Sequence, residues 1–241
     1  MISVVIPVLN EQDNIPVLLK EIVEISKIVP ISEVIYVNDG STDRTFDVLK
    51  SLRQDIPILR IIQHEKRSGQ SAAFMSGVRA AGNSIIVLMD GDGQNNPADI
   101  QKLYEIYTTH QKENKKIMVA GQREKRHDNA LRRLSSKYAN AIRSFVLKDG
   151  MRDTGCSLKL IRREDYLRLP YFDHMHRFLP ALLMRDGVKI LTAEVSHRPR
   201  ERGVSKYGFW DRLWVGIFDL VGVRWLLCRG LPHNFNSKEI L

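Results

Sequence analysis

Two aspartates and a glutamine directly follow a run of apolar residues that is rich in β-branched types. The run at residues 84–89 is typical of a buried strand, and it ends in Asp90, Asp92 and Gln94, spaced by glycines. In an open α/β sheet, ligands bind at the carboxyl ends of the strands. Carboxylate and amide oxygens on a short loop suit Mg²⁺ or Mn²⁺, which often hold the phosphates of a substrate. The segment alone predicts either a site for a metal and a diphosphate or a polar turn.

Two further loops place acidic side chains at predicted strand ends. Glu11 follows the apolar run at residues 2–9, and Asp39 follows the run at 33–38. The carboxyl ends of parallel strands meet at one edge of a sheet, so these residues are expected to lie around one crevice with Asp90 and Asp92. Gathered carboxylates raise one another's pKa, and a divalent cation would offset their repulsion. A carboxylate can also bind a ribose hydroxyl or a base edge. The alternative is a set of separate, solvated turn residues.

The elements that position these loops alternate between strand and helix through the first half of the chain. This order implies a mostly parallel sheet covered on both faces. Strands are expected at residues 2–9, 33–38, 57–63 and 85–89, and helices at 12–28, around 46–52, at 68–81 and at 97–107.

Gly69 opens the helix expected at 68–81. The N-terminus of a helix favours phosphate, although small residues there also suit tight packing.

The second half of the chain is less regular. Strands are expected at 117–120, 157–161 and 188–195, and helices at 129–147, 178–185 and 207–231.

Composition narrows the class of protein. The 241 residues carry a net charge of +9, which predicts anionic partners, and they are 43% hydrophobic, as in an ordinary globular chain. Two cysteines give no disulfide framework and favour a reducing compartment. The chain enters a strand pattern at Ile2, so no signal peptide is expected. The apolar stretch at 213–228 is too short and too charged to be expected to span a membrane.

Three motifs in this order carry a family resemblance. Residues 4–11, 38–43 and 90–97 resemble a family 2 glycosyltransferase of the GT-A type, and more narrowly the dolichol-phosphate mannose synthase-like branch. Residues 153–157, 176–181 and 197–208 also look like that branch, so the resemblance covers about residues 2–215. It implies a GT-A α/β fold, a mostly parallel central sheet flanked by helices, with a C-terminal amphipathic helical tail.

The resemblance also implies roles for matching residues. The nucleotide-sugar positions are Pro7, Asn10, Glu11, Asp39, Gly69, Asp90, Gly91 and Asp92, and the metal positions are Asp90, Asp92 and Gln94. The acceptor-phosphate positions are Arg123, Arg132, Arg133 and Ser136, with the choice between the two adjacent arginines left open. Arg202 and Lys206 match a loop that closes over the diphosphate, and Asp92, Arg123, Arg202 and Lys206 are the expected catalytic set.

The implied reaction is an inverting, metal-dependent sugar transfer from GDP-mannose or a UDP-hexose to a polyprenyl phosphate. A leaving nucleoside diphosphate needs Mg²⁺ or Mn²⁺ and cationic side chains. A polyprenyl phosphate is already an anion and needs no general base. It needs cations, and residues 121–143 carry seven Lys and Arg against two acids. A solvated helix face or a nucleic-acid-binding patch would also account for that run. His174, His176, His197 and Cys156 are expected to be packing or hydrogen-bonding groups.

The C-terminal residues suggest how the protein is located in the cell. A GT-A domain at residues 1–205 and an amphipathic membrane-interface tail at 206–241 are expected, because Trp beside basic residues suits a membrane interface. A helix that covers the core is the alternative. The enzyme is expected to attach peripherally to the cytoplasmic face of the membrane. It could form a homo-oligomer or bind a membrane partner protein, and it is not expected to bind nucleic acid.

Two rival functions are kept. One is a transferase acting on a soluble or protein-linked hydroxyl, which would need a carboxylate base such as Asp153. The other is a non-catalytic nucleotide- or nucleic-acid-binding module, which would leave residues 90–94 without a role and would bind oligonucleotides in a salt-sensitive way. The donor base, the sugar and the length of the polyprenol are not specified by these motifs.

Overall fold

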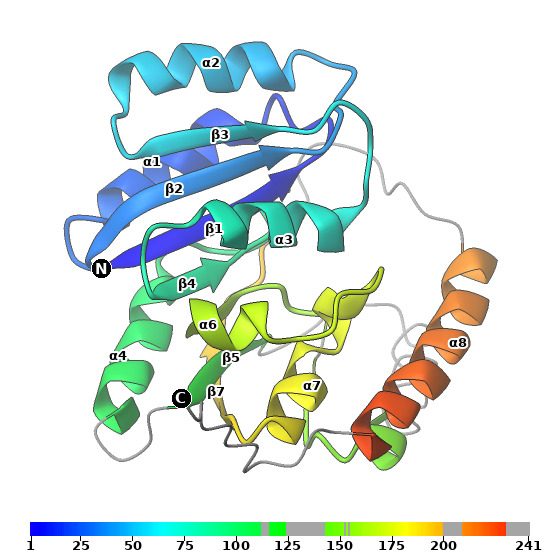
Figure 1. Ribbon diagram of the computed structural model, residues 1–241. Helices are drawn as coiled ribbons and strands as arrows, with labels where there is room; N and C mark the ends of the chain where they lie inside the picture. The colour runs from blue at the N-terminus through cyan, green and yellow to red at the C-terminus, as the bar shows by residue number, and fades with distance from the viewer. Residues whose placement is uncertain (112–115, 124–142, 152, 154, 200–208, 230–241) are drawn as a thin grey trace, which may run out of the picture.

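Within the part of the chain that the structure describes, seven strands form one mixed sheet in the order β3-β2-β1-β4-β6-β5-β7 (Figure 1). The structure is a computed structural model that describes residues 1–111, 116–123, 143–151, 153, 155–199 and 209–229. Six strands are parallel, and β6 runs antiparallel to its neighbours β4 and β5. The strands are β1 (Ile2–Val8), β2 (Ile31–Asn38), β3 (Leu59–Gln63), β4 (Ile85–Leu88), β5 (Ile117–Arg123), β6 (Lys159–Arg162) and β7 (Lys189–Val195).

Helices cover both faces of the sheet because the central strands are apolar on both sides. Along β1, Val4 and Ile6 enter one core cluster and Val5 enters the other. The first cluster is closed by α1 (Ile15–Ile25), α2 (Thr45–Asp55) and α4 (Asp99–Gln111), and the second by α3 (Gln70–Ala80), α6 (Arg163–Leu167), α7 (Leu179–Arg185) and α8 (Phe209–Cys228), with the short helix η1 (Met175–Arg177) beside α3 (Figure 1).

The predicted α/β class and its alternation of strands and helices are confirmed. Helix α1 is shorter than the predicted 12–28, and two short elements, α6 and η1, were not predicted. Most of the helix expected at 129–147 lies outside the described residues.

One edge of the sheet collects the chain segments that carry the predicted site. The parallel strands β1, β2, β4, β5 and β7 all end there. Strand β6 runs the other way, so its first residue, Lys159, is paired with Leu88 at the end of β4. The antiparallel strand therefore brings the segment before it, which includes Asp153 and Ser157, to the same edge as the ends of its parallel neighbours.

Helix α8 has one packed face and one exposed apolar face. Val223 is buried and Leu220 packs against the core beside α7. On the other side Phe218, Val221 and Trp225 are exposed by 74%, 66% and 60%. Among the described residues, no helix combines the length and the apolar character needed to cross a membrane. The division at residue 205 stays a prediction because it falls within 200–208, outside the described part.

Candidate active site

The Asp90–Gln94 loop follows β4 at the edge of the sheet where the parallel strands end, and it is held by neighbours on two sides. The Asp90 N–H donates to Ser157 Oγ at 3.1 Å. Gln70 Nε2, at the start of α3, donates to Asp90 Oδ1 at 2.6 Å. Within the loop, the Gln94 N–H donates to Asp92 Oδ1 at 3.1 Å. The predicted metal ligands are thus brought together on one turn whose position is fixed by α3 and by the segment before β6.

The electrostatics of this loop fit a divalent cation. Burial, followed by the nearby charge of Asp92, raises the pKa of Asp90 to about 6. The Asp90 and Asp92 carboxylates, together with the Gln94 amide, form a hard oxygen donor set of the kind Mg²⁺ and Mn²⁺ accept. In the described residues no three His, Cys, Asp or Glu side chains converge as a ready-made metal cluster. The ligand set predicted from the sequence is of a different kind, with two carboxylates, Asp90 and Asp92, and the amide of Gln94.

Gly91 is required by the close approach of this loop to β1. A Cβ atom at Gly91 would lie 2.4 Å from Val8 Cγ1 and 3.1 Å from the carbonyl oxygen of Pro7. The predicted nucleotide-sugar positions Pro7 and Gly91 therefore lie close together, and the absence of a side chain at Gly91 allows this close approach.

Gly91→Ala is expected to destabilise the fold by about 1–3 kcal/mol, because the added methyl group forces the loop away from β1. Chemical denaturation measures the change. Gly222→Ala on α8 is the matched control, since nothing lies within 4 Å of a Cβ there, and it should leave stability equal or higher. Equal stabilities for wild type and Gly91→Ala would contradict the contact.

Asp39 organises the turn that precedes α3. Its Oδ1 accepts the N–H of Ser68 at 2.8 Å and its Oδ2 accepts the N–H of Gly69 at 2.9 Å. His64 Nδ1 lies 2.8 Å from Oδ1. Gly69 has a φ of +94°, a backbone conformation that favours glycine. Oδ1 has two partners and Oδ2 has one, so the second lone pair of Oδ2 could accept a hydrogen bond from a ligand while Asp39 holds this turn.

Asn10 and Glu11 tie the first loop to the second. Asn10 adopts φ of +53°, and its Oδ1 accepts the N–H of Thr42 at 2.8 Å. The Glu11 N–H donates to Thr45 Oγ1 at 2.9 Å, and Glu11 Oε2 accepts from Asn14 Nδ2 at 2.7 Å. Both predicted nucleotide-sugar residues lie at the same sheet edge as Asp39, as the sequence led us to expect.

Arg123, at the end of β5, is a cation that acts electrostatically on Asp90. Its Nε and Nη2 donate to the two carboxylate oxygens of Asp153 at 2.6 and 2.8 Å. That hydrogen bonding raises the pKa of Arg123, and Arg123 in turn acts electrostatically to favour the charged form of Asp90. The ion pair uses two of the five N–H donors of the guanidinium, which leaves donors that can bind an anion.

Sequence reasoning missed Lys159, a buried cation that acts electrostatically on Asp90. Its side chain donates to the carbonyl oxygen of Cys156, and burial lowers its pKa. Lys159, like Arg123, favours the charged form of Asp90. Only its position two residues after the 153–157 motif could have indicated it. Cys156 is buried and burial raises the pKa of its thiol, as expected for a packing residue.

His176 is a packed, neutral histidine. Its Nδ1 lies 2.8 Å from Ser71 Oγ on α3. Burial, followed by the charge of Arg177, lowers the pKa of His176 to about 3. The prediction that this histidine is a hydrogen-bonding group is consistent with its position.

The low pKa of His176 predicts acid sensitivity of the fold. The unfolded chain takes up a proton near pH 6.5 and the folded chain only near pH 3, so stability falls as the pH drops through that window. The slope for one proton is at most about 1.4 kcal/mol per pH unit. Denaturation between pH 7 and 4.5 should show a weaker pH dependence in His176→Gln than in wild type. His110→Gln on α4 is the control, and an unchanged pH dependence in His176→Gln would count against this assignment.

Five predicted site residues lie outside the described part of the chain. They are the acceptor-phosphate candidates Arg132, Arg133 and Ser136 and the loop residues Arg202 and Lys206.

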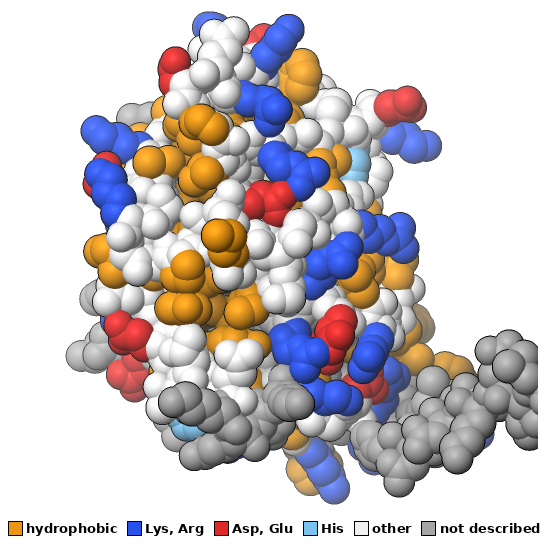
Figure 2. All heavy atoms as spheres, turned by 60° about the vertical axis from the view of Figure 1, so that its left-hand side comes forward, with side chains coloured by type: hydrophobic (Ala, Val, Ile, Leu, Met, Phe, Trp, Pro, Cys, Tyr) orange, Lys and Arg blue, Asp and Glu red, His pale blue; other side chains and the backbone are white. Residues whose placement is uncertain are grey.

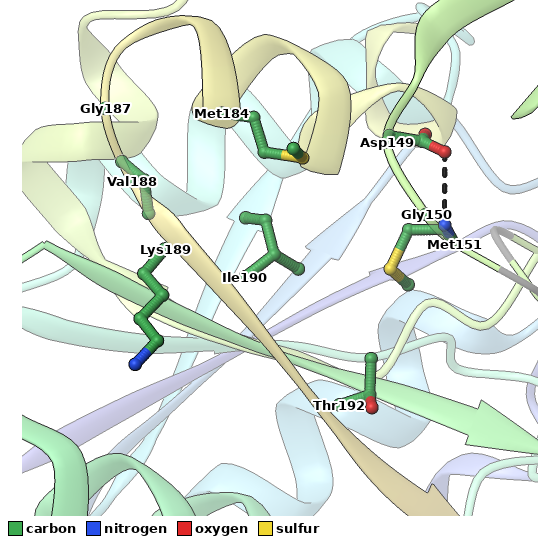
Figure 3. Close-up of a pocket in the computed structure, with 9 residues that line it drawn as sticks. All are labelled: Asp149, Gly150, Met151, Met184, Gly187, Val188, Lys189, Ile190 and Thr192. Atoms are coloured by element: carbon green, nitrogen blue, oxygen red, sulfur yellow. Dashed lines mark hydrogen bonds between the residues drawn. The ribbon is translucent and has the colours of Figure 1, made fainter.

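Two pockets differ in their relation to the site. One of about 180 Å³ is lined by Asp92 and Gly93 together with Asn14, Glu21 and Arg198. The other, of about 560 Å³, lies between the end of α7, β7 and residues 149–151, where Met151, Met184 and Ile190 lie around an apolar space and Lys189 extends away (Figure 3). No predicted site residue that the structure describes lines the larger pocket.

The basic charge of the chain is not gathered on the face drawn in Figure 2. Lys and Arg side chains lie there singly or in small groups, with Asp and Glu and hydrophobic side chains between them. Among the described residues, Arg123 of β5 and Lys159 of β6 are cations that act electrostatically on Asp90.

Known proteins resemble this chain in sequence and in fold. A dodecaprenyl-phosphate galacturonate synthase of Rhizobium johnstonii is 32% identical over 240 residues, covering 97% of this chain and 70% of the relative. An undecaprenyl-phosphate 4-deoxy-4-formamido-L-arabinose transferase of Pectobacterium carotovorum is 33% identical over 211 residues, covering 86% of this chain and 63% of the relative. This chain therefore spans about two thirds of the length of these proteins.

Solved structures support the fold. Glucosyl-3-phosphoglycerate synthase of Mycobacterium tuberculosis, in complex with Mn²⁺ and UDP-glucose, superposes with a TM-score of 0.68 at 19% identity, covering 97% of this chain and 80% of the other. The same enzyme with Mg²⁺ and UDP gives a TM-score of 0.68, also at 19% identity. The family model "Glycosyl transferase family 2" matches residues 3–169, which include the three loops at the sheet edge. The resemblance noted in the sequence is thus confirmed, and the chain belongs to glycosyl transferase family 2.

Proposed function

We propose that this domain transfers one sugar from a nucleoside-diphosphate sugar to a polyprenyl phosphate, in a reaction that requires Mg²⁺ or Mn²⁺. The observation that carries the proposal is the juxtaposition at one sheet edge of the Asp90–Asp92 carboxylates with the Arg123 guanidinium. The names of both polyprenyl-phosphate relatives support the acceptor class.

The donor half of the site is assigned to the loops at β1, β2 and β4. Asp39 and Asn10 are assigned to the nucleoside and Asp90, Asp92 and Gln94 to the cation. When bound, the cation neutralises charge that develops on the departing nucleoside diphosphate. The residues of this chain orient the donor and keep the sugar's anomeric carbon at the sheet edge, where Asp90 is partly shielded from water.

The acceptor half is assigned to Arg123. A phosphate monoester is an anion at neutral pH, so its oxygen can attack without a general base. The new bond joins that oxygen to the anomeric carbon while the bond to the diphosphate oxygen breaks, and attack from the opposite side inverts the anomeric centre. Arg123 binds the incoming phosphate and offsets its repulsion by the donor. Asp153, ion-paired to Arg123, holds the guanidinium in place and is not available as a base in this arrangement.

The acceptor also suggests where the enzyme works. A polyprenyl chain lies in a bilayer, and the exposed apolar face of α8 would dip into the membrane interface. We therefore propose peripheral attachment to a membrane through α8, with the cytoplasmic face as the expected side.

A transfer screen tests the function. Purified protein receives Mn²⁺ or Mg²⁺, a panel of radiolabelled UDP- and GDP-sugars and short polyprenyl phosphates, and label is followed into the organic phase. Label from one donor, lost in Asp92→Ala, is the expected result and identifies the sugar. Metal-dependent nucleotide binding with no lipid-linked label from any donor would refute the acceptor class, and label appearing instead on a hydroxyl acceptor would identify the rival function.

A further inference from the structure

Arg198, in the segment that follows β7, holds two parts of the domain together. Its Nη1 donates to both carboxylate oxygens of Glu21 on α1, each at 2.8 Å. Its Nη2 donates to Asn96 Oδ1 at 2.9 Å. One planar guanidinium thus joins α1 to the residues directly after the predicted metal ligand Gln94.

The backbone of the same segment is bonded to the metal loop. The Arg198 N–H donates to the carbonyl oxygen of Gln94 at 3.0 Å, and Asn95 and His197 form an isolated antiparallel bridge. One step earlier, the N–H and the hydroxyl of Ser196 both donate to Asp99 Oδ2, at 2.8 and 2.7 Å. The segment 196–198 therefore runs beside residues 94–99 and is bonded to them at each step.

The metal loop needs such support because its own sequence does little to fix it. Gly91 and Gly93 flank Asp92, and Gly93 adopts φ of +75°. Glycine allows many backbone conformations in the absence of external contacts. The loop is anchored at its start by β4 and Ser157, and the Arg198 contacts anchor its end.

The stabilising value of the ion pair itself is expected to be small. The Arg198 and Glu21 side chains are exposed by 39% and 33%, and exposed pairs contribute roughly 0–1 kcal/mol. Arg198 nevertheless bonds to both Gln94 and Asn96, and Arg198 and Glu21 line the pocket beside Asp92. The role of the pair is therefore better explained by the position that it gives to this loop than by a contribution to stability.

We propose that Arg198 and Glu21 form a positioning pair that holds the end of the Asp92–Asn96 loop so that Asp92 and Gln94 face a bound divalent cation. This rests on the proposed function for the identity of the cation, and it assigns the pair no contact with substrate. Helix α1 is a rigid support for it, because Leu18, Leu19 and Ile22 of the same helix are buried in the core.

Binding of Mn²⁺ in the presence of UDP, and in parallel GDP, tests the proposal without any turnover. Free Mn²⁺ is measured by electron paramagnetic resonance for wild type, Arg198→Ala, Arg198→Lys and Glu21→Gln. Loss of a group that supports a metal ligand typically weakens metal affinity by about 10–100-fold. We expect at least tenfold for Arg198→Ala, less for Glu21→Gln, and only partial rescue by Lys, which lacks the planar fork.

A matched control separates positioning from general stability. Arg60 pairs with Glu33 across β3 and β2, at the far end of the sheet, with an exposed fraction of 46%. Arg60→Ala should leave Mn²⁺ affinity unchanged. The double variant Arg198→Ala/Glu21→Gln should bind Mn²⁺ as weakly as Arg198→Ala alone, since the two residues act through one contact.

The outcomes distinguish this inference from the proposed function. Unchanged Mn²⁺ affinity in Arg198→Ala overturns the positioning role while the transfer reaction stands. If the variants bind Mn²⁺ more weakly than wild type, but wild type transfers no sugar in the screen, the positioning role is supported and the proposed function is overturned. If wild type binds no Mn²⁺ with either nucleotide, both are overturned.

Discussion

Asp92→Asn is expected to lower kcat for sugar transfer by about 10³-fold at saturating Mn²⁺. Asparagine keeps the size of the side chain and an oxygen that can accept the Gln94 N–H, so the loop retains its internal hydrogen bond. What is lost is the negative charge of a residue that we propose as a ligand to the cation. A cation that stabilises the leaving diphosphate contributes several kcal/mol to the transition state, and each 1.36 kcal/mol is about a factor of ten in rate.

The same substitution has a second, independent consequence. The Asp92 charge helps to raise the pKa of Asp90, so its removal should bring that pKa down from about 6. Titration of the Asp90 carboxyl group by NMR would follow it. Asp47→Asn, an exposed carboxylate on α2, is the control for both measurements. If Asp92→Asn retained more than about a tenth of the wild-type kcat, against the expected loss of about 10³-fold, Asp92 would be excluded as an essential ligand.

The fold was largely predictable from the sequence because the strands have unusually clear signals. Val4, Val5 and Ile6 are all buried, so β1 reads as a continuous apolar run, and the helices that follow repeat their apolar residues at helical spacing. The short elements α6 and η1 were missed because five and three residues are too few to display a helical period. The antiparallel direction of β6 is set by its pairing with β4 and β5, which no local pattern reveals.

Of the candidate site, only the residues at the carboxyl ends of strands could be predicted from the sequence. Asp39, Asp90 and Arg123 lie where the carboxyl ends of parallel strands place them. The residues that hold them come from elsewhere in the chain: Gln70 reaches Asp90 from α3, and Asp153 reaches Arg123 from the segment before β6. Such contacts join residues 20 and 30 positions apart, and the geometry that aligns them appears only in the packed fold. Lys159 is the extreme case, since its only signal in the sequence is its place two residues after the 153–157 motif, and its effect on Asp90 depends on the pairing of β6 with β4.

Arg123→Lys is expected to raise the KM for the polyprenyl phosphate by about 10–100-fold and to leave the KM for the donor nearly unchanged. Lysine keeps the positive charge, so long-range attraction of the acceptor persists. It cannot form a two-point contact with Asp153 and bind a phosphate oxygen in the same geometry. Hydrogen bonds to charged groups contribute about 1.5–3 kcal/mol, which corresponds to that range of KM.

Steady-state kinetics with each substrate varied in turn distinguish the two halves of the site. Arg162→Lys is the control. Arg162 lies at the other end of β6 and is ion-paired to Glu164, so its substitution should change neither KM. Asp153→Asn should resemble Arg123→Lys in weaker form, because it frees the guanidinium without removing it. A rise in donor KM with no change for the acceptor would instead assign Arg123 to the diphosphate. The acceptor phosphate would then have to be bound by cations elsewhere in the chain, which makes this the measurement that decides how the two anionic substrates are divided at the sheet edge.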